Sequence, residues 1–420
     1  MSNSNAFKRE IGFMVRDRAV LVWMVVVLCL STVAVWAGQA EVQHQRDTIE
    51  RLMILDEQDR SSEIAGQGDW GGAAYYSFHV TYDPPSNFAF AAMGQRDSSA
   101  WKHRLRMLAL EGQIYEHDAG NPVLALIGRF DFVFFAAFVL PLVLIFLLHD
   151  LRASERVAGR YDLLVATLGR DGSFWWSRAF LRSLVIFIAA VIPLLIVGVI
   201  SGTNLFTLLS AIVFVLAYLI FWTLVCIWFG RWQRSASVIL AALIGVWVLQ
   251  STIIPAGGRL LIDKMVPAPS GADILMTQRE AVNDAWDMPK EDTMRPFLER
   301  HPEWSNTAEI ERPFEWKWYY AFQQVGDQTA EELSSDYTAG RIKRDRWAGV
   351  LAILAPPALL ERSFQRLAGT DVTAVLAYEN KVRAFHAELR AFYYPGLFGD
   401  QPFEEFAIEN LPEFGIEEAN

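Results

Sequence analysis

The chain has 420 residues and a formal net charge of −11 at pH 7; 53% of its residues are hydrophobic and 20% are charged. Its mean hydropathy of +0.20 argues against a purely soluble protein. The acidic balance offers no basic surface for nucleic acid, which excludes that class of partner. Cys29 and Cys226 both lie in apolar runs, which argues against a disulfide framework or a zinc site.

Five apolar runs are long enough to cross the ~30 Å hydrocarbon core of a bilayer as helices. They predict transmembrane spans at 19–37, 129–149, 184–200, 205–229 and 236–255. The first run follows basic residues, as a secretory signal would, but its length and the lack of a small-residue cleavage site predict an uncleaved span. Prolines inside two runs, Pro141 and Pro193, are tolerated where neighbouring helices satisfy the freed carbonyl groups. Pro255 is predicted to end the fifth span.

Basic residues near the span ends predict the orientation. Lysines and arginines gather in the N-terminal segment 1–18, in the loop 150–183 and in the short loop that contains Arg231 and Arg234, whereas the turn 201–204 has none. Loops that carry positive charge near the span ends usually lie in the cytoplasm. We therefore expect a multi-pass protein of the bacterial inner membrane with a cytoplasmic N-terminus. Segment 1–18 is expected to include a short interfacial helix at 7–15.

Two long polar segments, 38–128 and 256–420, are predicted to form two extracytoplasmic domains that are α/β or mainly helical. Within the second segment, Trp347–Leu360 is too short for a confident span and contains two prolines, which favours a half-buried helix. Between 372 and 393, apolar residues recur at helical spacing, which predicts a helix with a buried stripe. The fold class is thus a polytopic α-helical membrane protein with about five spans.

Motifs for catalysis are missing from the sequence. It contains no G-x-x-x-x-G-K-[ST] loop for ATP phosphates, no H-E-x-x-H zinc motif and no G-x-S-x-G elbow. We therefore expect no enzyme activity and no cofactor in this chain. Asp131 and Arg129, at the end of the second span, are interpreted either as an interfacial pair or as a contact that guards a substrate path.

The loop 150–183 is the most informative polar segment. A charged stretch with Glu155 and Arg156 is followed by an amphipathic turn with Leu163, Leu164 and Leu168. This pattern predicts a short helix that lies across the membrane face. Such a helix is either a surface on which a cytoplasmic partner acts or an ordinary amphipathic connector.

Residues 128–167 resemble the permeases of ABC type-2 transporters, in which a span that ends in charged residues leads to an E-R-x-x-G-x-x-x-L-L-like coupling segment. Here that segment comprises Glu155, Arg156, Gly159, Leu163 and Leu164. Among these permeases, the sequence resembles a subgroup with large extracytoplasmic domains and an uncharacterised C-terminal permease region. This resemblance is carried by Pro84–Pro85–Ser86, Asn121–Pro122, the stretch LAPPALLERSFQRLAGTD at 354–371 and FYYP at 392–395.

The resemblance implies a permease subunit that couples ATP hydrolysis to substrate export or to mechanical work. The implied partners are a cytoplasmic ATPase dimer that binds ATP and Mg²⁺, a second copy or a sister permease, and a periplasmic or envelope protein. The coupling residues would be Glu155, Arg156, Gly159, Leu163, Leu164 and Leu168. Members of the subgroup usually end with a sixth span, whereas this sequence ends in a polar stretch, 412–420. Either the sequence is truncated or this member has five spans.

A second interpretation is a membrane scaffold or sensor that does not transport and whose extracytoplasmic domains bind a protein partner. The aromatic stretch Trp304–Tyr320 could supply a docking face, because exposed aromatic residues often anchor interfaces. Packing inside the domain explains the same pattern equally well.

Overall fold

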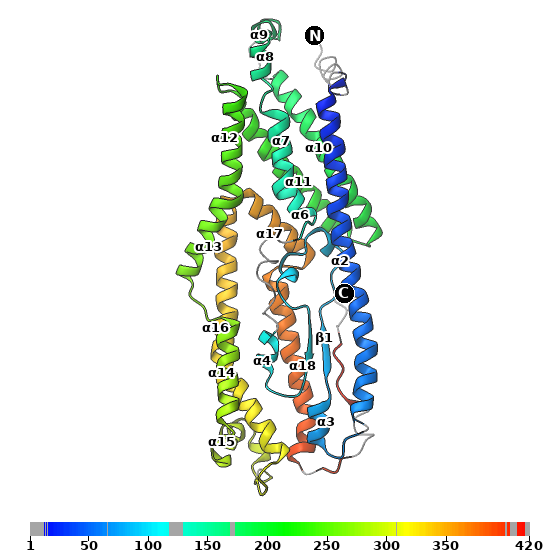
Figure 1. Ribbon diagram of the computed structural model, residues 1–420, viewed down its shortest axis with the longest axis vertical. Coiled ribbons are helices and arrows are strands. Elements are labelled where there is room, and N and C mark those ends of the chain that lie inside the picture. Colours follow the sequence, from blue (N-terminus) through cyan, green and yellow to red (C-terminus); the bar gives the residue numbers. More distant parts are fainter. Residues whose placement is uncertain are drawn as a thin grey trace.

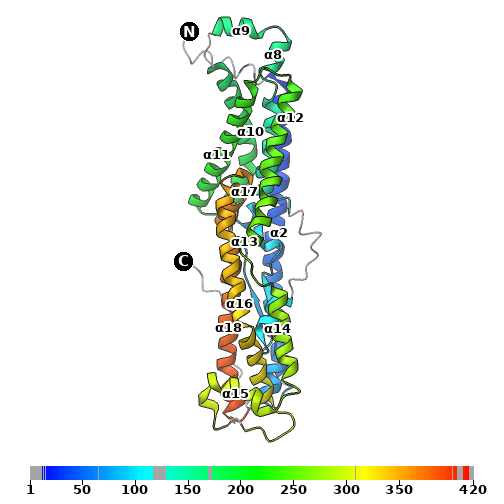
Figure 2. The ribbon, with the colours of Figure 1, turned by 90° about the vertical axis from the view of Figure 1, so that its left-hand side faces the viewer.

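The computed structural model describes residues 12, 14, 16–64, 66–116, 129–168, 173–307, 309–399, 401–403 and 410–415. The protein is elongated and 77% helical (Figures 1 and 2). Five described helices are long and apolar enough to cross a membrane: Arg18–Ile64, Phe132–Val157, Phe174–Ile200, Leu205–Gly230 and Ala236–Met265. They coincide with the five predicted spans, so the polytopic helical membrane class is confirmed.

These spans form one bundle. Its helices are α2 (Arg18–Ile64), α6 (Phe132–Phe134) with the π-helical turn η4 (Phe135–Val139) and α7 (Leu140–Leu148), α10 (Ser173–Ile200), α11 (Leu205–Gly230), and α12 (Ala236–Val248) with the π-helical turn η5 (Leu249–Ile253) and α13 (Ile254–Met265). We call the end of the bundle that carries α8 (Ala153–Val157) and α9 (Tyr161–Leu168) the proximal end (Figure 1). The interfacial helix predicted at 7–15 lies largely outside the described residues.

Two helices continue beyond the predicted ends of their spans. Helix α2 does not end near Ala37 but continues to Ile64, because the polar residues that follow the apolar run are good helix formers. Gly38 lets the backbone at Phe90 pack closely against α2, because a Cβ at position 38 would lie only 1.9 Å from the carbonyl oxygen of Phe90. The fifth span does not end at Pro255 either. Pro255 directly follows the π-helical turn η5 inside a continuous helix, which runs on to Met265.

The proline in the second span shows how the bundle satisfies a freed carbonyl group. Pro141 has no N–H to donate to the carbonyl oxygen of Ala137, four residues earlier, and the helix widens there into the π-helical turn η4. Tyr218 of α11 donates its hydroxyl hydrogen to this oxygen at 2.6 Å, at a buried position. A side chain of a neighbouring span thus replaces the missing bond, as predicted for prolines inside spans.

Replacing Tyr218 with phenylalanine is expected to destabilise the protein by about 1 kcal/mol, because it leaves the Ala137 carbonyl group without this donor in an apolar interior. The measurement is the midpoint of thermal unfolding in detergent. Tyr76→Phe is the matched control, since the Tyr76 side chain is 48% exposed. Equal midpoints for the two variants would show that the Tyr218 hydrogen bond contributes nothing measurable.

The remainder of the described chain forms a second half, which we call the distal body. It contains the second half of α2 and two further groups of elements. From the first polar segment come α3 (Trp70–Tyr76), β1 (His79–Tyr82), η1 (Ala89–Ala91), η2 (Gly94–Asp97), β2 (Lys102–Leu105) and α4 (Leu110–Tyr115). From the second come α14 (Gly271–Asp284), α15 (Lys290–Arg300), η6 (Pro302–Trp304), α16 (Trp316–Ala352), α17 (Pro356–Ala368) and α18 (Val372–Phe398). Strands β1 and β2 pair antiparallel, with His79 opposite Leu105.

The two polar segments, predicted as separate domains, share their hydrophobic cores. In one core, Trp70 and Met107 of the first segment pack with Phe297, Trp318 and Tyr393 of the second. A second core joins Leu105, Leu110 and Ile114 to Ile274, Ala330, Tyr378 and Val382. Short strands and helices such as β1, β2 and α4 bury too little apolar surface to fold alone, so they complete their core against the long helices α16 and α18.

The predictions for the second polar segment are largely confirmed. The helix predicted at 372–393 is α18, and its stripe Val375, Tyr378, Val382, Phe385 and Leu389 is buried. The half-buried helix expected at 347–360 is divided between the end of α16 and α17, with Pro356 in the first turn of α17. Helix α17 buries Leu360 and Phe364 in the same core as the spans, so it closes the bundle at the base of the distal body.

Candidate functional site

The proximal end is built from the segment of α8 and α9, which contains the six residues predicted for coupling. Helix α8 ends at Val157, and the turn after it contains Gly159, whose φ of +67° is a left-handed conformation that favours glycine. The backbone N–H of Gly159 donates to the carbonyl oxygen of Arg156 at 3.0 Å, and α9 begins two residues later. Gly159 therefore supplies the turn that lets two short helices follow one another at this end (Figure 2).

Two charged side chains fasten this segment to the spans. The carboxylate of Glu155 accepts hydrogen bonds from Arg160 at 2.8 Å and from Arg178 of α10 at 3.4 Å. Arg156 donates to the carbonyl oxygen of Trp232, in the turn between α11 and α12, at 2.8 Å. A displacement of α8 would therefore pull on two different parts of the bundle.

Aromatic packing strengthens the same connection. The ring of Tyr161, at the start of α9, stacks on Trp175 of α10 with centroids 6.0 Å apart. Arg152 and Arg178 both lie over the Trp175 ring, and Arg156 lies over Tyr161. Each such cation–π contact contributes about 0.5–1 kcal/mol at a solvent-accessible site. The short helices are thus held by several weak contacts together.

Apolar side chains of this segment remain on the surface. Val157 and Leu163 are 89% and 67% exposed, and Leu164 is half-buried. Leu168 lies in the last turn of α9, and its side chain is outside the described residues. Of the six residues predicted for coupling, Glu155 and Arg156 bind the spans, Gly159 makes the turn, and Leu163 is exposed.

Asp131 and Arg129 are close in sequence but have separate partners, so their predicted interfacial pair is wrong. Asp131 is 5% exposed and caps α6: its carboxylate accepts from the backbone N–H of Phe134 and of Met93, each at 2.9 Å. Arg129 instead forms ion pairs with Glu41 and with Asp97, the latter at 2.7 Å. Both residues connect the second span to the distal body. Asp131 binds at a helix N-terminus, which favours a carboxylate, and Arg129 pairs with other acidic side chains.

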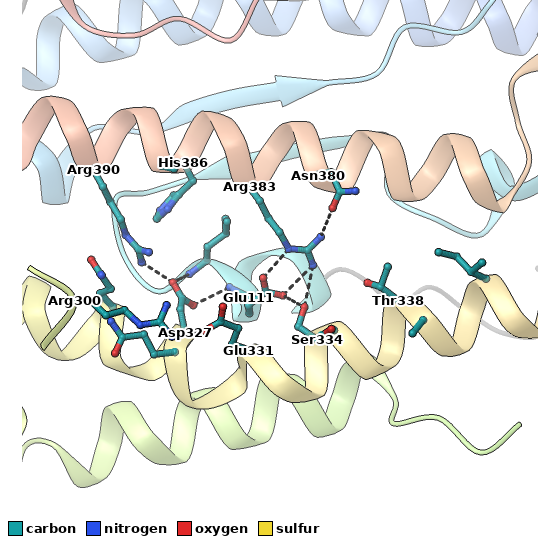
Figure 3. Close-up of a pocket in the computed structure, with 17 residues that line it drawn as sticks. Glu111, Arg300, Asp327, Glu331, Ser334, Thr338, Asn380, Arg383, His386 and Arg390 are labelled. Carbon is teal, nitrogen blue, oxygen red and sulfur yellow. Dashed lines mark hydrogen bonds and ion pairs between the residues drawn. The ribbon is translucent and has the colours of Figure 1, made fainter. Parts of the chain in front are cut away.

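A polar cleft of about 560 Å³ lies in the distal body between α4, α16 and α18 (Figure 3). Three acidic and three basic side chains face it in pairs. Arg383 binds Glu111 through two hydrogen bonds of 2.7 and 3.0 Å, Arg390 binds Asp327 at 2.5 Å, and Arg300 pairs with Glu331. The cleft is therefore charged on its walls but balanced overall.

The pair of Glu111 and Arg383 is the most enclosed part of the cleft. Glu111 is 7% exposed, and its carboxylate also accepts the hydroxyl hydrogen of Ser334 at 2.9 Å. Arg383 further donates to the Tyr115 hydroxyl oxygen at 3.0 Å. Burial, and then the charge of Arg390, lower the pKa of His386 well below its ordinary value, so this histidine is neutral at pH 7. These contacts join α4, α16 and α18 through one polar network.

None of these cleft residues stands out in the sequence as a site. A signal is nevertheless present, since Asp327, Glu331 and Ser334 recur at helical spacing on α16, and Asn380, Arg383 and Arg390 do so on α18. Each stripe taken alone indicates a solvated helix face. Among the residues that the structure describes, no three His, Cys, Asp or Glu side chains are grouped to hold a metal ion.

One protein family matches part of the distal body. Residues 273–417 match a family described as a domain of unknown function (DUF3526). The matched region contains α16 and α18, two of the three helices that line the cleft. No curated protein and no solved structure matches the chain.

Proposed function

We propose that this chain is the membrane-spanning permease subunit of an ATP-driven ABC transporter in the bacterial inner membrane. The N-terminus and the proximal end would face the cytoplasm, and the distal body would lie outside. The observation that carries the proposal is the α8–α9 segment, which Glu155 and Arg156 fasten to the spans while Val157 and Leu163 stay exposed. A cytoplasmic ATPase dimer that binds this surface could transmit its closure to the bundle.

The shape of α2 favours mechanical work or export as the output. This helix is continuous from the spans into the distal body, and its 47 residues extend about 70 Å at the usual helical rise. A tilt of α2 within the bilayer would therefore displace the distal body as well. The chain would pair with a second copy or a sister permease, and ATP and Mg²⁺ would bind to the ATPase.

The test is co-purification of the chain with an ATPase that carries a Walker A motif and is encoded beside it. Leu163→Asp is expected to reduce the ATPase recovered by about tenfold or more, because it places a charge in an apolar contact. Glu155→Gln is expected to weaken the coupling of ATP hydrolysis, because it loosens α8 from α10. Met276→Asp is the matched control, since Met276 is 66% exposed but lies on α14 in the distal body. The proposal fails if no ATPase is recovered with the unmodified chain, or if Leu163→Asp and Met276→Asp behave alike.

The cleft in the distal body favours a second candidate, a scaffold or sensor that does not transport and binds a partner outside the membrane. Its polar walls suit a polar ligand or peptide better than a docking surface of aromatic residues would. In the predicted aromatic docking face at 304–320, Trp318 and Tyr320 are 4% and 1% exposed and pack inside the distal body, whereas Phe314 is 43% exposed. A kinase or receptor encoded beside this chain, in place of an ATPase, would favour this candidate.

A further inference from the structure

A second cavity, of about 580 Å³, lies where the fifth span meets the distal body, between α13, α16 and α17. Figures 1 and 2 show α13 beside the end of α16 that is nearest the spans, with α17 at the same level. The fifth span is the least covered of the five, since only 11% of its most apolar stretch is buried inside the protein. Lipid in a bilayer can therefore approach this cavity from the side.

One part of the cavity is apolar. Its lining includes Ile254, Pro255 and Ile262 from α13 and Leu351 from α16. Small residues on α16 and α17, such as Ala348 and Ala358, leave the space open. An acyl chain fits such a surface, because each buried CH₂ group contributes about 0.8 kcal/mol.

The other part of the cavity is charged, and it has one more arginine than it has acids, which are Asp263, Asp345 and Glu361. Four arginines line it: Arg259, Arg341, Arg344 and Arg362. Arg362 is occupied by two hydrogen bonds to Asp345, and Arg341 is paired with Glu379 at 2.8 Å. Arg259 and Arg344 share a single carboxylate, Asp263, at the longer distances of 4.0 and 3.6 Å, and Arg344 also donates to the carbonyl oxygen of Val266 at 3.0 Å. Their positive charge is therefore only partly neutralised.

One acid in the cavity is the half-buried Glu361 of α17, which forms no hydrogen bond or ion pair with the part of the chain that the structure describes. Burial, and secondly the nearby Asp131, raise the pKa of Glu361 to about 7. In its neutral form this carboxyl group can donate a hydrogen bond to an oxygen of a ligand. It therefore adds to the arginines a donor that suits an oxyanion.

We propose that this cavity binds one anionic amphiphile, with its acyl chain along α13 and α16 and its phosphate or carboxylate headgroup at Arg259 and Arg344. Basic pockets beside membrane helices recognise anionic lipid headgroups in this way. The ligand is either a lipid of the bilayer or a free single-chain amphiphile, which share this chemistry. The inference requires only that the chain spans a membrane, and it does not depend on the proposed function.

The test is native mass spectrometry of the full chain in detergent, titrated with dioleoyl phosphatidylglycerol or with dioleoyl phosphatidylcholine. We expect one phosphatidylglycerol to stay bound at concentrations where phosphatidylcholine is lost. Arg259→Gln and Arg344→Gln should each weaken binding about fivefold. Ala358→Phe should abolish it by filling the cavity. Arg346→Gln is the matched control, because Arg346 is exposed on α16 and does not line the cavity.

A parallel titration with dodecyl phosphate, kept below its micelle concentration, separates the two sources of ligand. Binding that also depends on Arg344 assigns the site to free amphiphiles, and binding of phosphatidylglycerol alone assigns it to bilayer lipid. Either result supports the proposal. Equal retention of the two phospholipids, or equal weakening by Arg344→Gln and Arg346→Gln, would overturn it. Because this readout includes no ATPase, it is independent of the co-purification experiment.

Discussion

Replacing Arg383 with leucine is expected to lower the free energy of unfolding by about 3–5 kcal/mol, because it leaves the carboxylate of Glu111 buried without its counter-charge. Glu111 is 7% exposed, and Arg383 supplies two of its hydrogen bonds. The loss should appear as a lower midpoint of denaturation in detergent, followed by tryptophan fluorescence. It should also loosen α4 from α16 and α18, which the same network joins.

The distal body offers a matched control for this variant. Arg279 of α14 forms an ion pair with Glu116 at 2.8 Å, but the two side chains are 53% and 57% exposed. Exposed pairs of this kind contribute about 0–1 kcal/mol, so Arg279→Leu should change the midpoint little. The double variant Glu111→Leu/Arg383→Leu should recover much of the loss, since it removes the buried charge together with its partner. If Arg383→Leu and Arg279→Leu shift the midpoint equally, burial does not govern the strength of these pairs.

The spans and the distal helix α18 could be predicted because their signals are local. An apolar run of span length is readable in one stretch of sequence, and so is the stripe from Val375 to Leu389 on α18. The positions at which the helices end were harder to predict. Neither the polar residues after Ala37 nor Pro255 stops its helix, because helix formers continue α2 and the helix widens into the π-helical turn η5 just before the proline.

The polar cleft lay beyond prediction for a different reason. Glu111 and Arg383 are separated by 272 positions, and Asp327 meets the backbone of Leu110 and Glu111 across 217 and 216 positions. Nothing in the sequence around either residue of such a pair indicates which residue is its partner. The assumption of two separate domains also concealed it, because it placed α4 and α18 in different bodies. In the proximal segment, by contrast, the paired residues Glu155 and Arg160 lie on one short stretch of sequence.

Glu361 gives the clearest expected dependence on pH. Burial, and then Asp131, raise its pKa to about 7 in the folded protein, from a value of 4.5 in an unperturbed chain. The folded state therefore binds this proton more tightly than the unfolded state does. Stability is undiminished by this group below about pH 4.5, and it falls as the pH rises from there to about 7, where the half-buried carboxyl group must lose its proton.

Glu361→Gln should remove this penalty, because glutamine has nearly the same shape and carries no charge at any pH. At pH 8 the variant is expected to be more stable than the unmodified protein by about 1–3 kcal/mol, and at pH 4.5 the two should be nearly equal. Midpoints of thermal unfolding in detergent, measured at both pH values, provide the comparison. Glu332→Gln, on the exposed face of α16, should leave the difference between the two pH values unchanged. A Glu361→Gln variant that is less stable at pH 8 would mean that the ionised carboxylate has a favourable partner, and would assign Glu361 to holding the distal body on the spans.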